Sequence, residues 1–257
     1  MSRIRQSVCF SNFLTRGLSA TALIEAATDI GYASIEMLPE EHWQQVQDCG
    51  LDIACVVGHA SLPDGLNKRE NHDRIEAELR TRIAAAAAWG IQSLIVFSGN
   101  RESRSEQEGR DNCVEGLLRV KDAAESAGVT LCMELLNSKV DHSDYQCDRT
   151  PWGVEVCHAV DSGHVRLLYD IYHMQIMEGD LIRTIDTHGQ WFGHYHTAGN
   201  PGRQDLDLEQ EIYYPPVMAA IQRSGYEGFV GHEFRPKADP VEALRAAFNL
   251  CDVGDSP

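Results

Sequence analysis

The sequence has no long apolar segment and few basic residues for its size. Its longest uninterrupted apolar run extends only from Ile83 to Trp89, whereas a membrane-spanning helix needs roughly 20 apolar residues. There are 22 Lys and Arg residues against 39 Asp and Glu residues, which gives a formal net charge of −17. Because this charge repels phosphate backbones and anionic lipid surfaces, we expect neither nucleic acid nor a membrane as a partner.

Several familiar motifs are also absent. The eight cysteines include no Cys-x-x-Cys pair, which argues against a zinc ribbon and against a redox dithiol. The opening residues contain no apolar stretch of signal-peptide length. No dinucleotide fingerprint, phosphate-cradling loop or Ser-His-Asp order is found. We therefore expect a cytoplasmic protein with reduced thiols and no organic cofactor.

A recurring local pattern indicates the fold. Seven times, a helix-like stretch is followed by a glycine and then by a short β-branched or aromatic run. Each glycine is predicted to end its helix in the left-handed conformation. With an opening strand around Val8 to Phe10, the pattern predicts eight strands separated by helices. The seven glycines are Gly31, Gly50, Gly90, Gly128, Gly163, Gly189 and Gly225.

Eight strands that alternate with helices predict parallel pairing and an α/β fold. Ser19 is a suitable cap for a helix that contains Leu23 and Ile30, and the stretch from Arg69 to Trp89 is rich in helix-forming residues. The length of 257 residues is typical of one (β/α)8 TIM barrel. We predict such a barrel as a single domain over residues 1–257, with an open doubly wound sheet as the alternative.

Polar residues end several of the predicted strands, and a barrel forms its active site from the carboxyl ends of its strands. These residues are Glu36, Glu134, Asp170, His196 and Glu233. The last four belong to consecutive strands. Strand alternation directs Glu134, His196 and Glu233 inward, whereas the residue before Glu233, His232, faces outward.

Three carboxylates cannot share a buried rim without a compensating positive charge. Glu134, Asp170 and Glu233, together with the imidazole of His196, therefore predict a divalent metal site. This donor set suits Mn²⁺ or Mg²⁺, with Co²⁺ as a substitute. The alternative for each acidic residue is a helix cap or a surface ion pair.

Four segments at these strand ends carry a family resemblance. They are MELLN (133–137), YDIYHMQIMEGDL (169–181), GHYHTAGNPGR (193–203) and GHEFRP (231–236). Together they resemble the hydroxypyruvate isomerase-like group of xylose isomerase-type barrels, which also contains ketose 3-epimerases. Hydroxypyruvate isomerases usually carry glutamine where His196 stands, whereas the epimerases carry histidine. The flanking segments NPGR (200–203) and MQIMEGDL (174–181) resemble the isomerase branch more closely.

The resemblance also implies residue roles. Glu134 and Glu233 match glutamates that bind the metal and act as the acid/base pair, and the other metal ligands fall on Asp170 and His196. The substrate-binding His and Arg of the family fall on His173 and Arg203. Outside the resemblance, His59 and Asn137 are candidate substrate contacts by their position after strand ends, although local turn roles fit them equally well.

We therefore expect a metal-dependent isomerase that acts on a short hydroxy-keto acid such as hydroxypyruvate. A divalent ion would stabilise the enediolate, and two carboxylates would move the proton. The nearest alternative is a ketose 3-epimerase. An apurinic endonuclease, which the net charge opposes, and a non-catalytic sugar-acid binding barrel are further alternatives. The substrate would be a small keto acid or ketose, and a homodimer or homotetramer is the expected assembly.

Overall fold

The structure is a computed structural model that describes residues 4–254. Residues 1–3 and 255–257, which the predicted domain includes, lie outside the described part. Contacts group the chain into two compact units. The first holds the described residues up to Ala54, together with Asp180–Gln190 and the residues from Tyr195 onward, and the second holds Cys55–Gly179 and Trp191–His194.

The first unit contains parallel strands in the order β3-β2-β1-β9-β8. They are β1 (Arg5–Cys9), β2 (Ser34–Glu36), β3 (Asp52–Ile53), β9 (Phe229–His232) and the end of β8 (Phe192–Thr197). Its helices are α1 (Phe10–Phe13), α2 (Ala20–Ile30), α3 (Trp43–Asp48), α9 (Leu181–His188), α10 (Tyr214–Arg223) and α11 (Pro240–Cys251). Short 3-10 turns lie at η1 (Glu40–His42) and, where the chain returns to the second unit, at η3 (Gly189–Trp191).

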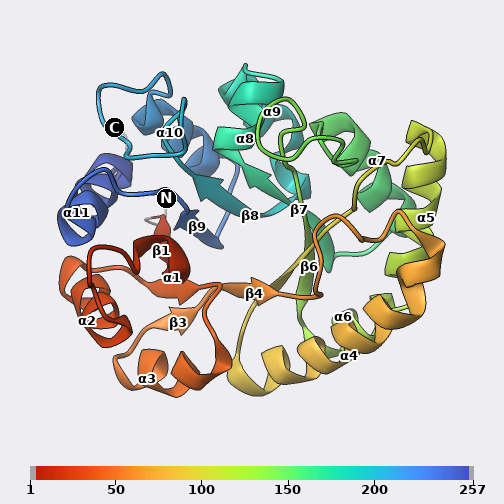
Figure 1. Cartoon of the computed structure of the whole chain (residues 1–257), viewed down its shortest axis with the longest axis horizontal. Coiled ribbons are helices and arrows are strands. Elements are labelled where there is room, and N and C mark those ends of the chain that lie inside the picture. Colours follow the sequence, from red (N-terminus) through yellow and green to blue (C-terminus); the bar gives the residue numbers. More distant parts are fainter. Residues whose placement is uncertain (1–3, 255–257) are drawn as a thin grey trace. The chain divides into compact units, whose positions relative to one another are not determined.

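The second unit contains parallel strands in the order β8-β7-β6-β5-β4. They are β4 (Cys55–Val57), β5 (Ser93–Val96), β6 (Thr130–Glu134), β7 (Val165–Asp170) and the start of β8. Its helical segments are η2 (Arg69–Asn71), α4 (His72–Trp89), α5 (Glu106–Leu118), α6 (Lys121–Ala127), α7 (Thr150–Val160) and α8 (Ile171–Met177). Helix α4 packs on β5, α6 on β6 and α7 on β7 (Figure 1).

Seven of the eight predicted strands correspond to single strands, and the third is divided. Its residues form β3 and β4, which are separated by Ala54. Strand β3 pairs with β2, whereas β4 pairs with β5, so the pairing partner changes at this residue. The Ser19 cap is confirmed, because its hydroxyl accepts the Ala22 N–H at 3.2 Å.

The glycine prediction holds at five of the seven positions and is wrong at two. Helix α7 ends at Asp161, which takes the left-handed conformation with φ 52°, instead of at Gly163. An aspartate tolerates this conformation better than most residues because its side chain is short and polar. Gly189 has φ −53°, because the chain continues there into the turn η3 instead of reversing.

Strands in both units are buried on both of their faces. All four residues of β5 and all four of β9 are buried, as expected of strands covered on both sides. His232 is buried, and its Nε2 lies 2.8 Å from Oε1 of Gln6, whose amide donates to the Phe248 carbonyl of α11 at 3.1 Å. His232 therefore faces the α11 side, as strand alternation predicts.

Membrane-spanning helices and disulfides are both absent from residues 4–254. Within residues 4–254, no helix combines the length and the hydropathy that crossing a bilayer requires. All eight cysteines lie in this range, and none of them forms a disulfide.

Candidate active site

Two carboxylates lie together where β6 and β7 end in the second unit. Glu134 is the last residue of β6, Asp170 is the last residue of β7, and both are buried. A carboxylate oxygen of Glu134 lies within 4.8 Å of a carboxylate oxygen of Asp170. Two like charges this close and this buried repel each other, and a divalent cation bound by both would offset the repulsion. Asp170 Oδ1 also accepts the His173 N–H at 3.0 Å, which caps α8.

The orientation of His173 is determined by Asn137. The Asn137 amide oxygen accepts the backbone N–H groups of Val140 and Asp141 at 3.0 and 2.9 Å, so the amide nitrogen is the group that faces His173. This nitrogen lies 2.6 Å from His173 Nδ1 and 2.7 Å from Asp141 Oδ2. Nδ1 therefore accepts, and a neutral imidazole carries its hydrogen on Nε2. That atom lies 3.6 Å from Asp170 Oδ2.

His59 follows β4, and both of its ring nitrogens contact the backbone. Nδ1 lies 3.1 Å from the Ala60 carbonyl, and Nε2 accepts the Phe97 N–H at 2.9 Å. Burial lowers the pKa of His59, which agrees with a neutral ring that donates at one nitrogen and accepts at the other. In the second unit, His59 thus links the ends of β4 and β5 through their backbones.

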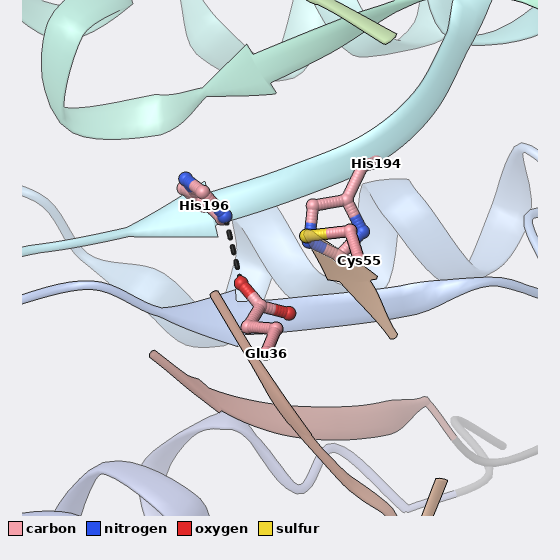
Figure 2. Close-up of side chains that lie close together, drawn as sticks. All are labelled: Glu36, Cys55, His194 and His196. Carbon is pink, nitrogen blue, oxygen red and sulfur yellow. Dashed lines mark hydrogen bonds and ion pairs between the residues drawn. The ribbon is translucent and has the colours of Figure 1, made fainter. Parts of the chain in front are cut away.

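The first unit brings His196 between two glutamates. Its Nε2 lies 2.8 Å from Glu36 Oε1, the contact marked by the dashed line in Figure 2. Its Nδ1 lies 3.1 Å from Glu233 Oε2. The side chains of Glu36 and His196 are fully buried, and that of Glu233 is 10% exposed. One imidazole therefore contacts a different carboxylate at each nitrogen.

The Glu36 carboxylate is held in place by residues of β1 and β9. Cys9 Sγ donates to Glu36 Oε1 at 3.0 Å. Burial raises the pKa of the Cys9 thiol, and the negative charge of Glu36 raises it further, so the thiol keeps its hydrogen. On β9, a Cβ at Gly231 would overlap the Glu36 carboxylate. The space that Gly231 leaves is the space that this carboxylate occupies.

Arg203 reaches Glu233 from the loop after β8. Its Nη2 forms an ion pair with Glu233 Oε2, and its backbone has φ 54°. The Arg203 carbonyl accepts the Arg235 N–H at 2.8 Å, which joins this loop to the segment after β9. The predicted substrate-binding arginine is thus within reach of a predicted catalytic glutamate.

A thiol–imidazole contact in the second unit has no counterpart in the sequence-based predictions. Cys55 Sγ lies 3.7 Å from Nε2 of His194, and both residues are buried (Figure 2). The sequence also left the pairing of Glu36 with His196 unrecognised. The available signal was that both residues fall at predicted strand ends, but the partner of each could not be read from that position alone.

The chain matches the family described as xylose isomerase-like TIM barrel over residues 24–251. The protein belongs to this family. The predicted (β/α)8 barrel is therefore confirmed, and the open doubly wound sheet is set aside. In a barrel of this kind, the carboxyl ends of the strands form the active-site face, and both pairs of candidate ligands occupy such ends.

Curated relatives are named as isomerases. A protein of Xenopus laevis named "Putative hydroxypyruvate isomerase" is 28% identical over 243 residues, which cover 86% of each chain. A 2-oxo-tetronate isomerase of Cupriavidus necator is 33% identical over 174 residues, which cover 66% of each chain. These relatives confirm the prediction of an enzyme of the isomerase or epimerase type.

Solved structures share the fold at low sequence identity. A family 2 AP endonuclease of Brucella melitensis has a TM-score of 0.84 at 21% identity, with 94% of this chain and 97% of that chain covered. D-psicose 3-epimerase of Clostridium cellulolyticum H10 has a TM-score of 0.79 at 17% identity, with 96% and 98% covered. At these identities the similarity establishes the fold alone.

Proposed function

We propose that the chain is a divalent-metal-dependent isomerase that acts on a short hydroxy-keto acid of the hydroxypyruvate type. The observation that carries the proposal is a pair of buried side chains in each unit, all four at the carboxyl ends of barrel strands. They are Glu134 with Asp170 on β6 and β7, and His196 with Glu233 on β8 and directly after β9. The names of the curated relatives support the reaction type.

The donor set fits a divalent ion. Three buried carboxylates and one imidazole offer hard oxygen atoms and a single nitrogen, which suits Mn²⁺ or Mg²⁺, with Co²⁺ as a substitute. Glu134, Asp170, His196 and Glu233 would hold this ion. When bound, it supplies a Lewis acid that polarises the substrate carbonyl and stabilises the negative charge that develops on its oxygen.

Glu134 and Glu233 are the proposed acid/base pair. Isomerisation removes a proton from the carbon beside a carbonyl and returns one to the neighbouring carbon, so one carboxylate accepts while the other donates. Each is buried at a strand end, where a low dielectric strengthens its interaction with substrate. The ion pair with Arg203 orients one oxygen of Glu233.

His173 and Arg203 are the proposed substrate-binding side chains. Asn137 faces Nδ1 of His173 and so places the ring hydrogen on Nε2. This Nε2–H donates to a substrate oxygen. The guanidinium of Arg203 binds the substrate carboxylate through parallel hydrogen bonds. Asn137 acts through His173, because both amide hydrogens and the amide oxygen are already used internally. His59 has a supporting role at the end of β4.

A ketose 3-epimerase is the second candidate, and one residue favours it. His196 is the histidine that the resemblance associates with epimerases, whereas hydroxypyruvate isomerases usually carry glutamine there. Both reactions share the proton removal beside a carbonyl, so the same residues would serve either. The net charge of −17 continues to oppose an endonuclease, which would have to bind a phosphate backbone.

The test uses the full chain stripped of metal with a chelator and then supplied with Mn²⁺, Mg²⁺ or Co²⁺. We expect hydroxypyruvate turnover to disappear without metal and to return with at least one ion. In D₂O, an isomerase places deuterium on carbon 2 of the aldehyde product, whereas a 3-epimerase places it on carbon 3 of a ketose. Exposed Glu242→Gln on α11 is the matched control for Glu134→Gln and Glu233→Gln. Full activity after metal removal would refute the proposal.

We also propose a homo-oligomeric assembly and a cytoplasmic location. We expect a homodimer or homotetramer, which sedimentation of the full chain measures. Reduced thiols agree with a cytoplasmic enzyme, since none of the eight cysteines forms a disulfide in the described residues.

A further inference from the structure

We propose that Glu36 is a positioning residue that orients His196 toward the metal site. The inference rests on the proposed function, because it requires a bound divalent ion. Glu36 takes no part in proton transfer to substrate. It acts through the imidazole, by determining which ring nitrogen carries hydrogen and which presents a lone pair.

The two ring nitrogens of His196 face different carboxylates. Nε2 lies 2.8 Å from Glu36 Oε1, and a carboxylate oxygen can only accept a hydrogen bond, so Nε2 is the protonated nitrogen. In the neutral ring, Nδ1 then carries the lone pair, and Nδ1 lies 3.1 Å from Glu233 Oε2. A lone pair and a carboxylate oxygen this close repel each other, and a cation bound by both would remove this repulsion. This is the arrangement of a metal-bound histidine whose second nitrogen donates to a carboxylate.

The surroundings of Glu36 hold its carboxylate in that position. Register pairs Cys9 with Glu36 across β1 and β2, and it pairs His196 with Gly231 across β8 and β9. The Cys9 thiol donates to the same Glu36 oxygen at 3.0 Å, and the missing side chain at Gly231 makes room for the carboxylate. A fully buried carboxylate is costly unless it is hydrogen-bonded. Cys9 and Gly231 therefore favour one placement of Glu36, and that placement directs the ring of His196.

The first measurement is Mn²⁺ affinity by titration calorimetry. We compare the wild type, Glu36→Gln, Glu36→Ala, His196→Gln and the double variant Glu36→Gln/His196→Gln. Removal of such an outer carboxylate typically weakens metal binding about 10–100-fold, and we expect this loss in Glu36→Ala and the lower end of it in Glu36→Gln. In the His196→Gln background, Glu36→Gln should change the affinity by less than about threefold, because there is no imidazole to position.

The second measurement reads the tautomer of His196 without metal. In wild-type protein with ¹⁵N-labelled histidine, two-dimensional NMR should show hydrogen on Nε2. In Glu36→Ala this preference should be lost, while the circular dichroism spectrum and the cooperative unfolding transition remain. Cys251→Ala is the matched control, because it removes another fully buried thiol of the first unit, on α11, and leaves Glu36, Cys9 and His196 unchanged. We expect its Mn²⁺ affinity to stay within about threefold of wild type.

Failures of the inference and of the proposed function are distinguishable. A wild-type chain that binds no divalent ion would refute the proposed function. Mn²⁺ binding of equal strength in the wild type and in both Glu36 variants would overturn only the inference. So would a wild-type His196 with hydrogen on Nδ1, or an equal affinity loss from Glu36→Gln with and without His196. A loss in Cys251→Ala as large as in Glu36→Gln would assign the effect to general packing and would also overturn the inference.

Discussion

Replacing Gly231 by alanine should disturb both stability and metal binding. Gly231 lies on β9, and a Cβ at this position would overlap the Glu36 carboxylate. Both the carboxylate and the surrounding strands are buried, so the added methyl group cannot move into solvent. Overpacking of this kind typically costs about 1–3 kcal/mol. For a chain of this size, that loss lowers the unfolding temperature by about 2–12 °C.

The clash should also move Glu36 away from His196. The contact between these residues is 2.8 Å, and a shift of even 1 Å breaks a hydrogen bond of this length. We therefore expect Gly231→Ala to weaken Mn²⁺ binding by about as much as loss of Glu36, which is roughly 10–100-fold. Differential scanning calorimetry and metal titration measure the two effects on the same sample.

Gly163→Ala is the control. No heavy atom lies within 4 Å of a Cβ at Gly163, and its φ is not positive. Alanine there should leave metal binding unchanged and stabilise the fold by up to about 1 kcal/mol, because it restricts the unfolded chain. In a double variant with Glu36→Ala, the methyl group at position 231 has room. The double variant should therefore be destabilised by less than the sum of the two single variants. Wild-type stability and affinity in Gly231→Ala, or full additivity with Glu36→Ala, would refute the packing argument.

Three further predictions follow from the contacts of the site. Glu134→Gln and Glu233→Gln should each fold and lower kcat by about 10²–10⁴-fold; circular dichroism checks the fold, and near-normal turnover in either variant contradicts the two-carboxylate scheme. Asn137→Asp replaces the donor that faces His173 Nδ1 with an acceptor, so kcat should fall at least about tenfold, and an unchanged pH profile of kcat would count against the positioning role. The pKa of His59 is lowered in the folded protein, so below the ordinary histidine pKa of about 6.5 the unfolded chain binds the proton of His59 more readily than the folded chain does. The contribution of His59 to the free energy of unfolding is therefore fully present above that pH and decreases as the pH falls toward the folded-state pKa. Urea denaturation of wild type and His59→Asn between pH 7.5 and 5 checks this, and parallel curves would show that His59 contributes nothing to the dependence.

The positions of the candidate ligands could be predicted from the sequence. Glu134 and Asp170 end predicted strands and do end β6 and β7. This succeeds because a strand is a local element with a period of two residues, and parallel strands in a barrel open their carboxyl ends on one face. The division of the third strand at Ala54 was not predicted, because it depends on which neighbouring strand each half pairs with.

The roles of Glu36 and Asn137 depended on the tertiary structure. The sequence indicated that Glu36 ends a strand, but its contact with His196 joins residues that are 160 positions apart and requires the space that Gly231 leaves. Asn137 was predicted as a substrate contact, yet its amide is directed inward by two backbone N–H groups. Local sequence thus determined which residues reach the strand ends, whereas packing between distant segments decided which atom of each side chain faces which partner. The physical reason is that hydrogen bonds act over about 3 Å, a scale that only the packed fold defines.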